Sequence, residues 1–309
     1  MQYTVQRIAY SIALLILLAF IVLVPGVGVL ALFVIPLPMM LLRMSGTRKV
    51  GVSFLVASIV IVLLLPSLQL SLFIVSFLLI GFVMAEALLH HQSKLSTLNW
   101  VVITLLFSFT LNYVLIVQFL NVNWVNQIQQ FFQSKEKQII DLFAPFDSTG
   151  SFETVVQSTF LMYELSLPTL LISGVVLIAF ISVSLTFSMG KKFVKGFTFP
   201  KFPPFYRLKL PMTLVVIYGI LLLVSFLQPM EIASNGHILF VNAMNIFRAL
   251  FVLQGISFLH YALRTMKTPN ILLVLVTLLA LFFHSITVLI GILDTGMNLR
   301  NWIDRKANK

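Results

Sequence analysis

Long apolar runs are the feature that most constrains this chain. Segments such as 8–24 and 269–293 are apolar all the way round a helix, whereas a helix on a soluble protein needs only one apolar stripe. Runs of about 20 apolar residues match the roughly 30 Å hydrocarbon core of a bilayer. Strands of membrane barrels would instead alternate over about 10 residues. With 60% hydrophobic and 9% charged residues, the sequence predicts an all-α, polytopic integral membrane helical bundle.

We expect eight or nine transmembrane helices, some of them short or broken by proline. Pro36 and Pro38 interrupt the second segment, and Pro66 ends the third. Such irregular backbone is tolerated inside a membrane only where protein or a cavity covers it. Because the segments use almost all of the chain, we predict a single membrane domain over residues 1–309. The segments are 8–24, 27–42, 51–66, 69–89, 98–120, 158–189, 211–230, 238–264 and 270–293.

Lys and Arg residues gather in alternate loops, as the positive-inside rule describes. The loop 190–210 is strongly basic, whereas the loop 121–157 balances its Lys residues against acids. We therefore place 190–210 in the cytoplasm and 121–157 outside. The same asymmetry accounts for the net charge of +11. We expect no nucleic-acid binding, because no basic soluble fold is present to support it.

The C-terminal tail does not fit this orientation. Counting crossings from the loop 190–210 places the tail outside, where few cations are expected. Either the tail is an exception to the rule, or one of the late segments does not cross the membrane. The charged residues of the tail are Arg300, Arg305, Lys306 and Lys309, against Asp294 and Asp304.

Two loops and the first segment carry candidate contact surfaces. Apolar residues recur at helical spacing over 124–143, which predicts an extracellular amphipathic helix on the membrane surface rather than another span. The inner loop interleaves Lys with Phe, which suits either anionic lipid headgroups or a cytoplasmic protein partner. Ala9 and Ala13 are small residues four apart, and this spacing lets another helix approach closely. The loop cations that we assign to docking are Lys191, Lys192, Lys195 and Lys201.

Arg248 is the strongest candidate for a binding residue. It lies ten residues into the segment 238–264, hence about 15 Å along a helix, and a charge at that depth should face a cavity or a partner. Asn245 shares a helix face with it, and Asn242 precedes both. These groups would suit an anionic or amide-bearing ligand. The alternative is that Arg248 pairs with Glu164 and only holds helices together. Asn112, near the outer end of the fifth segment, is a further candidate.

The sequence gives little support for an enzyme. It contains no cysteine, and we find neither the HExxH spacing of zinc proteases nor a Walker motif. His90 and His91 are adjacent, so they point in different directions on a helix. We therefore expect no catalytic residue, no metal and no cofactor.

Two stretches together resemble a known family. Residues 27–58 hold a short Pro-rich segment, an Arg/Gly turn and a helix that begins with Gly. Residues 272–300 hold a closing helix that ends in Gly-x-x-Asp with a downstream Arg. This arrangement is similar to the YybS-like predicted membrane proteins of Gram-positive bacteria, a family with no established activity. That family looks distantly related to the substrate-binding S components of energy-coupling factor (ECF) vitamin transporters and to the rod-shape protein MreD.

The resemblance implies a multi-pass protein of the bacterial plasma membrane. Residues 8–189 would be the S-component-like part, and 211–293 would add three further helices. S components usually have six spans, and no vitamin-binding signature is visible here, so the substrate does not follow. An Ala-x-x-x-Ala pattern on the first helix docks the coupling subunit in S components, and this role carries over to Ala9 and Ala13 only.

Two functional hypotheses follow. In the first, the chain is a transporter-type subunit that binds or moves a small molecule through a site in the outer half of the bundle. In the second, it is a non-catalytic membrane scaffold that recruits partners for cell-envelope processes. Both place the chain in contact with the lipid bilayer. The residues assigned to the small-molecule site are Arg248, Asn245, Asn242, Glu164 and Asn112.

Overall fold

The chain folds entirely into helices and connecting segments wherever the structure describes it. The computed structural model describes residues 2–24, 26, 28–146, 150–194, 197–227, 231 and 234–307. All regular elements within these ranges are helical, which confirms the predicted all-α class. The chain divides into two compact units, Met1–Phe131 with Leu171–Phe202, and Phe132–Leu170 with Pro203–Lys309. Each unit has its own hydrophobic core, and the expectation of one membrane domain stays a prediction.

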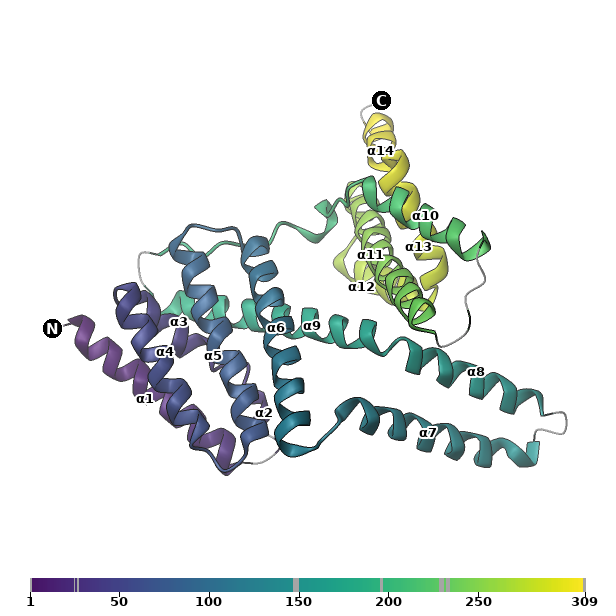
Figure 1. The fold of residues 1–309 in the computed structure, drawn as a ribbon. Coiled ribbons are helices and arrows are strands. Elements are labelled where there is room, and N and C mark those ends of the chain that lie inside the picture. The colour runs from purple at the N-terminus through teal and green to yellow at the C-terminus, as the bar shows by residue number, and fades with distance from the viewer. Residues whose placement is uncertain are drawn as a thin grey trace. The chain divides into compact units, whose positions relative to one another are not determined.

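The core of the first unit forms around α3 and α5. Pro36 and Pro38 lie in the first turn of α3, where the missing N–H of proline costs no helical hydrogen bond. Gly81 of α5 lets the two helices touch, since a Cβ there would lie 2.6 Å from the Pro36 carbonyl oxygen. The helices of this unit are α1 (Gln2–Leu23), α2 (Gly28–Ala31), α3 (Pro36–Met44), α4 (Arg48–Leu63), α5 (Leu68–Leu89), α6 (Lys94–Leu120) and most of α9 (Leu167–Phe193), labelled in Figure 1.

Helix α11 is the centre of the second unit. It is 31 residues long, and α13 packs closely against it because two glycines remove the intervening side chains. Gly255 of α11 faces Thr287, and Gly291 of α13 faces the Phe251 carbonyl. The helices of this unit are most of α7 (Trp124–Phe143), η1 (Ala144–Phe146), α8 (Ser151–Leu165), η2 (Phe205–Arg207), α10 (Thr213–Leu227), α11 (Asn235–Thr265), α12 (Asn270–Phe282), α13 (His284–Met297) and α14 (Leu299–Ala307).

Among the described residues, five helices are long and apolar enough to cross a membrane, or six if the bent pair α12–α13 counts as one span. The second and seventh expected segments correspond to shorter apolar helices, Gly28–Met44 and Thr213–Leu227. Helix α4 has only 16 residues, about 24 Å of rise. The expected number of eight or nine spans is therefore not confirmed by helix length and composition.

Two of the expected spans are interrupted. The segment 158–189 is not one helix, because α8 ends at Leu165 and α9 begins at Leu167. Pro168 follows at once, in the first turn of α9, where proline is tolerated but cannot continue a preceding helix. The segment 270–293 breaks at Phe283, where α12 and α13 meet at 106°. The carbonyl and N–H groups freed at each break need partners inside the protein.

The contact between α11 and α13 gives a test of the fold. Replacing Gly291 with Ala should lower the melting temperature by several degrees, because the new Cβ would collide with the Phe251 carbonyl oxygen and overpacking costs about 1–3 kcal/mol. Gly296 lies on the same helix with nothing within 4 Å of an added Cβ, so Gly296→Ala is the matched control. Thermal unfolding of both purified variants in detergent measures the difference. Equal melting temperatures would contradict this packing.

Candidate functional site

A buried ion pair links α13 to α14, and its arginine also bonds to the segment before α10. Asp294 and Arg300 are 2% and 4% exposed, and the Nη2 of Arg300 lies 2.9 Å from the Oδ2 of Asp294. The guanidinium also donates to the carbonyl oxygens of Tyr206 at 2.7 Å and Leu208 at 2.8 Å. A buried charge needs a counter-charge and satisfied hydrogen bonds, and Arg300 has both.

Two side chains of α11 complete this polar cluster. The Gln254 amide donates to Asp294 Oδ2 at 2.6 Å and accepts the Leu210 backbone N–H at 3.0 Å. The Ser257 hydroxyl donates to the Phe205 carbonyl oxygen at 2.8 Å. The cluster therefore ties α11, α13, α14 and the segment 205–210 together, and its bonds are made within the protein.

A second ion pair, between a buried arginine and a half-buried glutamate, lies in the first unit. The Nε of Arg43 is 2.8 Å from the Oε1 of Glu86, and its Nη1 donates to the Gly46 carbonyl oxygen at 3.2 Å. Gly51 at the start of α4 makes room, since a Cβ there would collide with the Arg43 side chain. Arg43 is buried, although it lies just beyond the expected second segment, 27–42.

The Asp294–Arg300 pair and the arginine of the Arg43–Glu86 pair fall on the stretches that carried the family resemblance. Arg43, Gly46 and Gly51 form the Arg/Gly turn and the glycine that starts the next helix. Gly291, Asp294 and Arg300 form the Gly-x-x-Asp pattern with its downstream Arg. By sequence, Asp294 and Arg300 count among the charged residues of the C-terminal tail, and their spacing is the sequence signal for a pair.

The predicted amide stripe of α11 supports the break between α8 and α9. The Asn242 side-chain oxygen accepts the Thr169 N–H at 2.8 Å and the Thr169 hydroxyl at 2.7 Å. Its amide nitrogen donates to the Leu165 carbonyl oxygen at 2.7 Å. Asn245 donates to the Ser166 hydroxyl at 2.9 Å. These hydrogen bonds satisfy backbone groups on both sides of the interruption, so Asn242 has a structural role.

Arg248 does not face the interior of its unit. Its side chain lies on the exposed side of α11, and no hydrogen bond or ion pair joins it to any described residue. Glu164 is half-buried and also makes no ion pair within the described ranges. Arg248 is therefore not buried in its unit as its depth suggested, and the alternative pairing with Glu164 is not seen among the described residues. Ligand binding by either residue stays a prediction.

The remaining predicted residues lie apart from these. Asn112 belongs to the first unit, where its amide donates to the Leu72 carbonyl oxygen at 3.1 Å and to the Ser76 hydroxyl at 3.0 Å. Ala9 and Ala13 are exposed on α1, whereas Leu14 and Leu18 of the same helix are buried. Lys195 lies outside the described residues. Lys191, Lys192 and Lys201 are exposed, and their role in docking stays a prediction.

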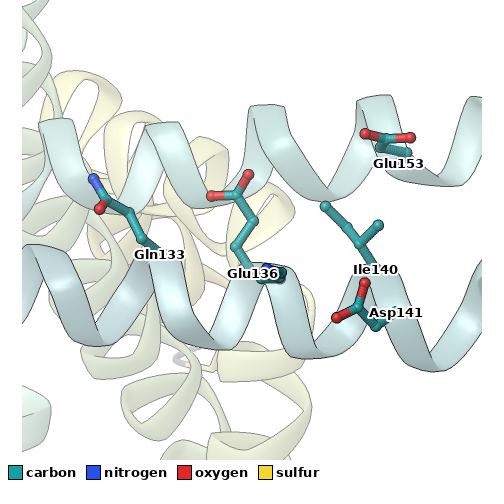
Figure 2. Close-up of a pocket in the computed structure, with 6 residues that line it drawn as sticks. Gln133, Glu136, Ile140, Asp141 and Glu153 are labelled. Carbon is teal, nitrogen blue, oxygen red and sulfur yellow. The ribbon is translucent and has the colours of Figure 1, made fainter.

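An open polar pocket of about 390 Å³ lies between α7 and α8. Figure 2 shows Gln133, Glu136 and Ile140 pointing from α7 toward α8, which carries Glu153. No group of three or more His, Asp or Glu side chains in the described chain is arranged to hold a metal ion. The helix expected over 124–143 is present with these bounds, and its position on a membrane surface stays a prediction. Lys137 and Asp141 complete the lining of the pocket.

The bonds of Asn242 predict a large loss of stability when it is replaced. Asn242→Leu should lower the melting temperature, because it leaves the Thr169 N–H and the Leu165 carbonyl oxygen without side-chain partners, and each such group costs about 1–3 kcal/mol. Arg248→Leu, six residues along the same helix, should have little effect. Thermal unfolding in detergent compares them. A greater loss from Arg248→Leu would restore Arg248 as an interior group.

Comparisons with known proteins agree with a membrane protein. The family model described as "Predicted membrane protein (DUF2232)" matches residues 11–295. The chain is 25% identical over 293 residues to the "Uncharacterized protein YybS" of Bacillus subtilis (strain 168), covering 91% of this chain and 92% of that protein. No solved structure matches the chain. With five or six helices in its described part that are long and apolar enough to cross a membrane, and a family match over most of its length, this chain belongs to the DUF2232 family of predicted membrane proteins.

Proposed function

We propose that the chain is a non-catalytic subunit of the bacterial plasma membrane that binds a protein partner through its α7–α8 hairpin. A contrast between polar and apolar groups carries this proposal. Three buried polar side chains of the helices, Asp294, Asn242 and Asn112, are hydrogen-bonded within the protein. The hairpin instead exposes apolar side chains outside the helical cores.

Aromatic contacts hold the hairpin together. Helices α7 and α8 lie side by side (Figure 1), with the rings of Phe132 and Phe160 6.4 Å apart and those of Phe143 and Phe152 4.9 Å apart. Such ring pairs add about 0.5–1.5 kcal/mol beyond their burial. With 20 residues in α7, the hairpin is about 30 Å long, long enough to act as an arm.

The end of the arm is apolar. Residues 142–146 read Leu-Phe-Ala-Pro-Phe, and Leu142 and Phe146 are well exposed. Exposed apolar patches on a polar background mark sites of protein or membrane contact. We assign the tip to a protein partner with a complementary apolar surface, as expected for the scaffold hypothesis. The exposed Lys191, Lys192 and Lys201 would meet lipid headgroups or a second partner on the other side of the membrane.

A small molecule is the second candidate ligand, because the hairpin also forms the pocket between α7 and α8. Glu136, Asp141 and Glu153 outnumber Lys137 in its lining, which favours an amine-bearing compound. Most of the first unit lies within residues 8–189, the part of the chain that the resemblance assigns to an S component. In this transporter-type alternative the pocket would replace Arg248 as the site of capture.

Photocrosslinking at the tip tests the partner proposal. A benzophenone amino acid in place of Phe146, which is 83% exposed, should form an adduct with a second protein in living cells. The matched control is Phe226, 82% exposed at the end of the apolar helix α10, where lipid is the expected neighbour. Absence of a protein adduct at Phe146, or the same adduct at both positions, would contradict the proposal.

Native mass spectrometry of the purified protein separates the two candidates. A stoichiometric protein partner without a retained small molecule supports the scaffold. A co-purifying small molecule whose retention falls in Glu136→Gln, but not in Arg248→Gln, supports capture in the hairpin pocket.

A further inference from the structure

We infer that α12 and α13 form a re-entrant hairpin, so that the C-terminal tail lies on the same side of the membrane as the segment 203–210. All the contacts behind this inference lie within the second unit. They concern the length of the two helices, the place to which the chain returns, and the depth that the hairpin reaches along α11.

Neither helix is long enough to cross alone. Helix α12 has 13 residues and α13 has 14, so each rises about 20 Å against a hydrocarbon core of about 30 Å. Their axes meet at 106°, far from a continuous span. The Thr287 hydroxyl donates to the Ala280 carbonyl oxygen at 2.7 Å across the bend, which supplies a partner to backbone freed by the break.

The chain returns to the segment from which α10 begins. Arg300, three residues beyond α13, donates to the carbonyl oxygens of Tyr206 and Leu208 at 2.7 and 2.8 Å. These two residues precede α10 and belong to the basic loop. If α12 and α13 crossed the bilayer together, Arg300 would be about 30 Å from that loop. The observed contacts exclude that separation.

Contacts along α11 set the depth of the hairpin. Arg264, in the last turn of α11, lies 5.5 Å from the Tyr206 ring, so this end of α11 is at the basic loop. The neighbours of α12 and α13 on α11 include His260 beside Thr277 at 2.7 Å, Gly255 beside Thr287 and Phe251 beside Gly291. All lie in the C-terminal half of α11, so these contacts reach no further than the middle of that helix.

This arrangement removes the disagreement over the tail. Its cations, Arg300, Arg305, Lys306 and Lys309, come to lie on the side of Arg207 and Lys209. The basic loop and the basic tail then both obey the positive-inside rule. The exception considered for the tail is unnecessary, because a late segment enters the membrane without crossing it.

Cysteine labelling tests the inference in a chain that has no native cysteine. Lys209→Cys and Lys309→Cys should react alike with an impermeant maleimide, both protected in intact cells and both labelled after disruption. Ser134→Cys in α7 is the matched reference for the outer side. Labelling of Lys309→Cys in intact cells while Lys209→Cys stays protected would overturn the inference.

A reporter fusion gives a second readout if a cysteine is shielded. Green fluorescent protein fused after Lys309 of the full chain should fluoresce, because it folds in the cytoplasm, and alkaline phosphatase fused there should be inactive. An active phosphatase fusion with a dark fluorescent fusion would place the tail outside and reject the hairpin.

Discussion

Hydrocarbon offers no hydrogen bonds, so every interruption of a membrane helix has to find its partners within the protein. This constraint accounts for the position of two buried polar side chains at the helix breaks. Asn242 serves the break between α8 and α9, and Thr287 serves the bend between α12 and α13. Once those bonds are made, short and broken helices become compatible with an apolar environment.

The two buried arginines, Arg43 and Arg300, make the same kinds of contact in two different units. Each pairs with an acid and also donates to carbonyl oxygens of a loop next to a helix end, Gly46 for Arg43 and Tyr206 with Leu208 for Arg300. A planar guanidinium with five donors can do both at once, which the ammonium group of lysine cannot do with the same geometry. Gly51 leaves room for the Arg43 side chain, and Gly291, one turn before Asp294, lets the Phe251 carbonyl oxygen of α11 approach α13.

The all-helical class and the approximate helix positions could be predicted, because they depend on apolar run length. The breaks were not predicted, since Ser166 and Phe283 lie inside the expected segments 158–189 and 270–293, whose overall composition is apolar. Pro168 is a sequence signal for the first break. Averaging hydropathy over a window of residues hides a single proline of this kind. The paired Asp294 and Arg300 were visible as a pattern, but their burial depends on the return of the chain to residues 206–208.

Arg248 illustrates how far depth alone can mislead. The expectation rested on its distance along the helix, yet the face of a helix that meets the core is set by packing. At 100° per residue, Arg248 is about 60° round the helix from Asn245 and about 120° from Asn242. The amides therefore reach the α8–α9 break while the guanidinium turns away to the exposed side.

A double-mutant cycle on Asp294 and Arg300 tests most directly the claim that buried polar groups act here as structural clasps. Asp294→Leu and Arg300→Met should each lower the melting temperature, because each strands a buried charge, a loss of about 3–5 kcal/mol in other proteins. The double variant should lose clearly less than the sum of the two single losses. Small, additive losses would contradict the claim and show that the second unit does not depend on this pair.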